Sequence, residues 1–176
     1  MIIVLGIVVV IVIWYVSTMN GLRQREIKID EALSGIDVAL TKRYDVLTNS
    51  VETVKGYAKH EKELIVETIR MRQGMSMADR KAADGQMDEL QTRIFALAEN
   101  YPALQANENF KQLQKQIADC EEHLQAARRV YNSNVSSLNQ SIVAFPTSIV
   151  ANAIGVGPKD FFEADAKKKE NVEIKF

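Results

Sequence analysis

No Asp, Glu, Lys, Arg or His occurs in this 176-residue chain before Arg23. Apart from Gly6, residues 1–16 carry only apolar side chains. At ~1.5 Å per residue, a helix over residues 1–19 would be roughly 28 Å long, about the thickness of the hydrocarbon layer of a bilayer. A lone strand would leave its backbone N–H and C=O groups unpaired in lipid, whereas a helix pairs them internally. The stretch therefore predicts one transmembrane helix.

The same stretch lacks the marks of a cleaved signal peptide. No basic residue precedes the apolar run, and residues 17–21 contain no Ala-x-Ala cleavage site. A signal peptide and a buried core helix stay as alternatives, but an uncleaved anchor fits the length and the flanks best. Trp14 and Tyr15 end the run, where amphipathic rings suit the headgroup layer. The positive charges of Arg23, Arg25 and Lys28 follow it directly, so the positive-inside rule predicts a cytoplasmic C-terminal part and an N-terminus outside.

Cysteine and proline are scarce, and neither charge sign dominates. The single Cys120 cannot form an intramolecular disulfide, which agrees with a reducing compartment. The three prolines lie at 102, 146 and 158, so long helices are permitted from Leu22 to Tyr101. With 22 basic and 23 acidic side chains, the chain lacks the undiluted basic stripe that nucleic acid requires, and we expect no nucleic-acid partner.

Apolar residues after the span recur at steps of three and four, a spacing that indicates helices and that strands cannot produce. The first stripe fades towards Gly74 and holds Ile29, Leu33, Ile36, Leu40, Tyr44, Leu47, Val51, Val54 and Ala58. The second holds Ala83, Met87, Leu90, Ile94 and Leu97. The third holds Phe110, Leu113, Ile117, Cys120, Leu124, Ala127, Tyr131, Val135, Leu138, Ile142 and Phe145. Residues 76–79 approximate a capping box for the second helix, and Asn107 is the expected cap of the third, which Pro146 closes.

These patterns predict an all-α fold: an N-terminal single transmembrane helix followed by an antiparallel, up-and-down bundle of three long helices. The first of the three is either continuous or split near Gly56 or His60, which would give four. The predicted parts are an anchor over 1–19, a bundle over 20–146, and a short apolar segment with a charged tail over 147–176. The stripes also fit an intermolecular coiled coil, although three stripes in one chain can bury one another.

Catalytic and metal-binding motifs are not found. Cys120 and His123 are three residues apart, but a closed zinc site needs four ligands and the only other histidine is His60. Cys120 also lies on the third stripe, so a buried apolar thiol is expected there. No Gly-rich phosphate loop or nucleophile elbow is present. We therefore expect no enzymatic activity, no metal and no cofactor.

Long blocks of the sequence resemble the LemA family of bacterial membrane proteins. They are residues 43–45 with 51–61, residues 98–102 with 106–110, and the run from Tyr131 to Glu163. At residues 47–50, Leu-Thr-Asn-Ser replaces the family's Ile-Pro-Asn-Leu-like run, which puts any kink imposed by that proline in doubt. The resemblance implies a single-pass protein of the bacterial inner membrane, with its N-terminus outside and a cytoplasmic helical bundle. It carries over no catalytic residue, and it implies links to magnetosome membrane formation and to a membrane zinc metalloprotease.

Polar aromatic side chains near the predicted turns are candidates for binding a partner. Tyr57 and His60 are expected at the same bundle end as residues 100–102, unless Tyr57 packs on the turn and His60 is merely solvated. In the tail, two aromatic residues and a lysine run over 167–169 either form a packed cap with a frayed end or touch an anionic leaflet. The interaction candidates are Tyr57, His60, Asn100, Tyr101, Pro102, Phe161 and Phe162. The membrane-interface candidates are Trp14, Tyr15, Arg23 and Arg25.

The leading functional prediction is a membrane-anchored helical scaffold or adaptor that is not an enzyme. The lipid bilayer and further copies of the chain are its expected partners, with a membrane zinc metalloprotease as the other protein that the resemblance implies. Membrane remodelling and regulation of that protease are the alternative functions.

Overall fold

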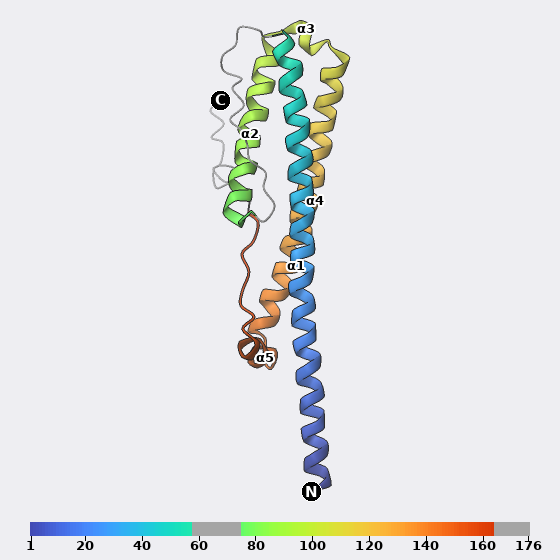
Figure 1. Cartoon of the computed structure of the whole chain (residues 1–176), viewed down its shortest axis with the longest axis vertical. Coiled ribbons are helices and arrows are strands. Elements are labelled where there is room, and N and C mark those ends of the chain that lie inside the picture. Colours follow the sequence, from blue (N-terminus) through green and yellow to red (C-terminus); the bar gives the residue numbers. More distant parts are fainter. Residues whose placement is uncertain (58–74, 164–176) are drawn as a thin grey trace, which may run out of the picture. The chain divides into compact units, whose positions relative to one another are not determined.

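The computed structural model describes residues 1–57 and 75–163, and every regular element within these ranges is a helix (Figure 1). The helices are α1 (Ile2–Tyr57), α2 (Met77–Glu99), α3 (Pro102–Gln105), α4 (Glu108–Val143) and α5 (Thr147–Ile154). The all-α prediction is confirmed. The predicted weakening of the first stripe, His60 and the lysine run lie outside the described residues.

The chain divides into two compact units. The first contains residues 1–35 and 127–161, and the described residues of the second are 36–57, 75–126 and 162–163. Helices α1 and α4 each contribute a segment to both units. Each unit buries apolar side chains of its own.

Helix α1 carries the apolar run and continues past it without a break into the charged, heptad-patterned segment. No proline interrupts this stretch, so the backbone hydrogen-bond ladder has no reason to stop. Among the described residues, α1 is the one helix that is long and apolar enough to cross a membrane. Its side chains over residues 1–14 are all exposed.

In the second unit, ion pairs fix the direction of α2 against α1. Asp37 pairs with Arg80, and further along α1 Arg43 pairs with Asp84. Because the positions on both helices increase together, α1 and α2 run parallel, whereas the chain returns in α4 (Figure 1). Three strictly alternating helices would have placed α2 antiparallel to α1. The split of the first helix that the four-helix version of the prediction needs falls on residues 58–74, outside the described part of the chain.

The core of the second unit consists mainly of stripe residues. The buried apolar residues include Ile36, Leu40, Leu47, Val51, Val54, Ala83, Met87, Ile94, Leu104, Phe110, Ile117, Cys120 and Leu124. Between Leu40 and Leu47 the fully buried position is that of Arg43, whereas the predicted stripe residue Tyr44 is half-buried. The stripe residues Leu90, Leu97 and Leu113 are half-buried as well. Arg43 also satisfies the three-and-four spacing, but its charge had excluded it from an apolar stripe.

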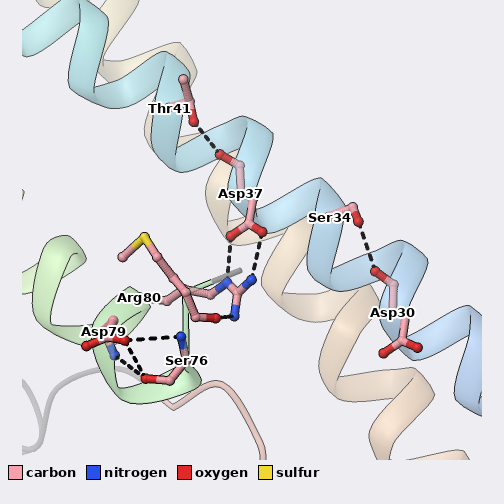
Figure 2. Close-up of polar contacts among 8 residues, drawn as sticks. Asp30, Ser34, Asp37, Thr41, Ser76, Asp79 and Arg80 are labelled. Atoms are coloured by element: carbon pink, nitrogen blue, oxygen red, sulfur yellow. Dashed lines mark hydrogen bonds and ion pairs between the residues drawn. The ribbon is translucent and has the colours of Figure 1, made fainter. Parts of the chain in front are cut away.

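Helix α2 begins as predicted. Ser76 is the N-cap: its Oγ accepts a hydrogen bond from the Asp79 backbone N–H at 3.1 Å, while its own N–H donates to the Asp79 carboxylate at 3.2 Å (Figure 2). This reciprocal pair satisfies two N–H groups that the helix itself leaves without acceptors. The helix ends at Glu99, and Pro102 opens α3 at its first helical position.

Two short features connect α2 to α4. Helix α3 was not predicted, because four residues are too few to show a periodicity. Asn107 caps α4 as expected, since its side-chain oxygen accepts a hydrogen bond from the Phe110 backbone N–H at 3.1 Å.

In the first unit, the end of α4 runs antiparallel to α1. Asn134 donates a hydrogen bond to the Lys28 carbonyl at 3.0 Å, and three residues further along α4 the Ser137 carbonyl accepts one from Arg25 at 3.4 Å. Figure 1 shows α5 alongside α1 in this unit. The buried apolar residues here are Leu22, Ile29, Tyr131, Val135, Leu138, Val150, Ala151 and Val156.

The third stripe ends earlier than predicted. Helix α4 stops at Val143, and Phe145, expected to be its last core residue, is 83% exposed. Pro146 lacks the N–H that would extend the ladder, and it instead precedes α5, which closes at Gly155 in the left-handed conformation. The short apolar patch expected after Pro146 is thus a helix that buries Val150 while Ile149 stays exposed.

Candidate functional site

Directly after the apolar run, α1 is tied to α5 by Arg23. One guanidinium nitrogen pairs with Glu26 at 2.8 Å, and the other donates to the Ile154 carbonyl at 3.3 Å. The last carbonyls of a helix lack intrahelical donors, so a cation at this end of α5 meets both an open acceptor and the negative pole of the helix dipole. Arg23 therefore joins the predicted membrane exit to the C-terminal part of the first unit.

Arg25 and Lys28 line a partly open polar hollow between α1 and α4 within the same unit. Arg25 donates to the backbone and the side chain of Ser137. The hollow has a volume of about 260 Å³, and its lining residues are Gly21, Gln24, Arg25, Lys28, Asn134 and Ser137. Its polar lining and position next to the apolar run suit it to water or lipid headgroups more than to an apolar ligand.

Polar contacts hold the segment after α5 against α4. Asn139 and Lys159 exchange two hydrogen bonds of 2.9 Å, in which the Asn139 side chain meets both backbone groups of Lys159. The Tyr131 hydroxyl donates to the Asp160 carbonyl at 2.9 Å. These bonds replace the regular hydrogen bonding that a non-helical segment lacks.

The predicted membrane-interface residues all lie on α1, in its first half. Trp14 is 37% exposed and Tyr15 is half-buried, so the aromatic pair marks the point where α1 first gains contacts. Arg23 and Arg25 lie two to three turns further on and pair with the first unit as described. Their place at a membrane interface stays a prediction, and the sequence gave no sign of the contacts that Arg23 and Arg25 make with residues far along the chain.

The structure separates the two tail aromatics that were expected to act together. Phe162 is 2% exposed, so its ring is not available to a lipid or a partner, whereas Phe161 is 40% exposed. Of the two alternatives for the tail, the buried Phe162 ring fits the packed cap and not contact with a leaflet.

Residues 100–102 form the junction between α2 and α3. Asn100 caps α2 and its side chain donates to the Ala96 carbonyl at 3.3 Å; Tyr101 is half-buried and Pro102 exposed. Tyr57 is the last residue of α1. Figure 1 draws the C-terminal end of α1 and the short helix α3 at the same end of the second unit. The Tyr57 side chain and His60 lie outside the described part of the chain, so their expected meeting with Tyr101 stays a prediction.

A buried arginine that we had not singled out as a site organises the second unit. Arg43 is 1% exposed, and its guanidinium lies 2.8 Å from Asp84, 2.6 Å from Asp88 and 2.6 Å from Glu121. Gln91 also accepts a hydrogen bond from it at 3.1 Å. The cluster joins α1, α2 and α4, so it fixes the register of three helices through one side chain.

A second arginine repeats the arrangement near the start of α2. Arg80 approaches the Asp37 carboxylate with two nitrogens, at 2.6 and 2.8 Å, and also donates to the Met75 carbonyl (Figure 2). The two-pronged geometry matches the fixed fork of a guanidinium. A pattern of apolar residues does not reveal either cluster, because the buried residue in each is an arginine. Arg43 and Arg80 nevertheless occupy positions that fit the three-and-four spacing of the buried residues.

Cys120 is buried, as the third stripe predicts, and His123 is exposed. Burial raises the pKa of the Cys120 thiol, and the neighbouring Glu121 adds to the rise, so the thiol stays neutral and poorly nucleophilic. Within residues 1–57 and 75–163, no group of three or more His, Cys, Asp and Glu side chains is placed to hold a metal ion.

Comparison of the sequence with known proteins places the chain in a family. The sequence profile of the LemA family matches residues 32–176, which is most of the chain. Protein LemA of Metamycoplasma hominis is 26% identical over 164 residues, covering 90% of this chain and 75% of that protein. Magnetosome protein MamQ of Magnetospirillum gryphiswaldense is 25% identical over 80 residues, covering 46% of this chain and 29% of that protein. The breadth of the profile match shows that the chain is a member of the LemA family.

Proposed function

We propose that this protein is a non-enzymatic, membrane-anchored helical scaffold or adaptor at the inner face of the bacterial cytoplasmic membrane. One observation carries the proposal: the helix that holds the apolar run is also a core element of the first unit, where it packs with α4 and α5. An anchor that is part of a folded core holds that core at the membrane without a flexible tether. Such an arrangement suits a protein that positions partners.

The basic side chains after the run support the orientation. Arg23 and Arg25 follow the apolar segment and no basic residue precedes it, which favours a cytoplasmic C-terminal part. The partner in this proposal is a second copy of the chain or another membrane protein. If a membrane zinc metalloprotease is found among the bound proteins, the version of the proposal in which this chain regulates that protease is favoured.

Membrane remodelling is a second candidate, and two observations favour it. The MamQ relatives are named magnetosome proteins, although this chain spans only about three tenths of their length. The first unit also exposes Val143, Phe145 and Ile149 at the turn between α4 and α5. Apolar side chains at a membrane surface are a means of disturbing lipid packing.

Crosslinking in native membranes, followed by purification in mild detergent, tests the proposal. A scaffold gives discrete oligomers or a defined partner, while a strictly monomeric chain without partners contradicts the proposal. In the control protein, residues 1–19 are replaced by an unrelated single-span helix. Retention of the same products with this control assigns assembly to the helical units, whereas their loss assigns it to the anchor. Vesicles that change shape on reconstitution of the purified chain alone would instead favour remodelling.

A further inference from the structure

Three apolar side chains at the turn between α4 and α5 are left out of the core. Val143 is 78% exposed, Phe145 83% and Ile149 56%. They come from the last residue of α4, from the connecting turn and from the first turn of α5. We call these three residues the apolar foot. A gathering of large apolar side chains on a surface marks a place of contact with something other than water.

The register of the first unit gives the level of the foot along α1. Asn134 binds the Lys28 carbonyl and Ser137 contacts Arg25. Three residues forward along α4 therefore correspond to three residues back along α1. A further six residues along α4 lead from Ser137 to Val143. Six residues back along α1 lead from Arg25 to Met19, at the end of the predicted membrane span. Val143 is therefore about level with Met19.

Burial along α1 confirms this level independently. Every residue up to Trp14 is exposed, and the first half-buried positions are Tyr15, Thr18 and Met19. The first unit therefore reaches back along α1 as far as its aromatic pair. That pair is the part of a membrane-spanning helix that lies among the lipid headgroups.

We propose that the apolar foot inserts into the headgroup–acyl boundary of the leaflet from which α1 emerges. The inference rests on the proposed membrane anchoring and adds a second attachment, so that the first unit lies on the bilayer surface. Arg23 and Lys159, whose side chains are 54% and 45% exposed, belong to the same unit and are available to anionic headgroups. Apolar side chains next to cationic ones are the combination that interfacial segments use.

Position favours lipid over a protein as the occupant. A surface level with the end of a membrane span meets headgroups wherever it faces, because the bilayer surrounds the span on every side. A second copy of the chain covering the foot is the competing possibility, and the test below separates the two.

The test uses the full chain reconstituted in vesicles, with Cys120→Ala as background and an environment-sensitive fluorophore on a single new cysteine. One variant carries Val143→Cys and its matched control carries Val130→Cys. Both valines are exposed residues of α4, and Val130 lies thirteen residues earlier, roughly 20 Å further from the foot. Lipids brominated near the headgroup should quench the Val143 probe by about half and leave the Val130 probe nearly unchanged. Ile149→Cys is the second probe of the foot.

Trp14 is the only tryptophan of the chain and reports the anchor in the same samples. Quenching of Trp14 together with the Val143 and Ile149 probes supports the proposal. Quenching of Trp14 without quenching at the foot overturns the foot and leaves the anchoring intact, and unquenched Trp14 overturns the anchoring itself. Foot probes shielded from aqueous iodide yet untouched by brominated lipid show coverage by protein, which also overturns the proposal.

Discussion

Arg43 shows how much one side chain contributes to this fold. Its guanidinium is buried and surrounded by Asp84, Asp88 and Glu121 from two other helices. A buried cation costs free energy to remove from water, and the surrounding carboxylates offset that cost only while all of them are in place. The cluster therefore specifies which faces of α1, α2 and α4 meet.

Replacing Arg43 with alanine should lower the free energy of unfolding by about 3 kcal/mol, because it removes the buried guanidinium that pairs with three carboxylates. Urea unfolding of the full chain in detergent measures the loss. Lys111→Ala is the control, since Lys111 and Glu108 form an exposed pair on α4 whose removal should cost less than about 1 kcal/mol. An Arg43 variant no less stable than the Lys111 variant would contradict this account of the cluster.

Cys120 gives a second test at the same scale. Its thiol is buried and its pKa is raised, so below that pKa the thiolate fraction is smaller than for an exposed cysteine. In the folded chain, maleimide labelling at neutral pH should be at least about tenfold slower than after unfolding, and it should quicken as the pH rises. Equal rates in the two states would mean that the third stripe is not packed as described.

At the scale of elements, the helices follow from the sequence more fully than their directions do. Three-and-four spacing, the cap at Ser76 and the cap at Asn107 were sufficient to place α2 and α4. The parallel course of α1 and α2 is set by ion pairs such as Asp37 with Arg80, which periodicity does not reveal. Phe145 fits the spacing of α4 but follows its last turn, so spacing alone assigned it wrongly to the core.

The cap of α2 makes a prediction of its own. Ser76→Ala should cost about 1 kcal/mol of stability, because the Asp79 N–H loses its acceptor at the helix start. Ser34→Ala is the matched control within α1: the Ser34 hydroxyl only donates back to the Asp30 carbonyl, and alanine is the better helix former (Figure 2). The Ser34 variant should be as stable as the wild type or slightly more so. Equal losses for both serines in thermal unfolding would rule out a special role for the cap.

At the scale of the whole molecule, sequence and comparison together establish a LemA family member whose first helix is apolar enough to span a bilayer. The long apolar helix was predictable because a charge-free run of this length has few alternatives in water. The apolar foot and the arginine clusters were not, because each depends on contacts between residues far apart in the sequence. The proposed membrane contact of the foot therefore depends on a surface that only the fold assembles.

Extraction of native membranes with alkaline carbonate tests the central claim most directly. The full chain should stay in the membrane pellet, because the apolar run and not surface charge holds it there. A chain that lacks residues 2–19 is the matched control and should appear in the supernatant. Release of the full chain into the supernatant would contradict the account of a membrane-anchored scaffold.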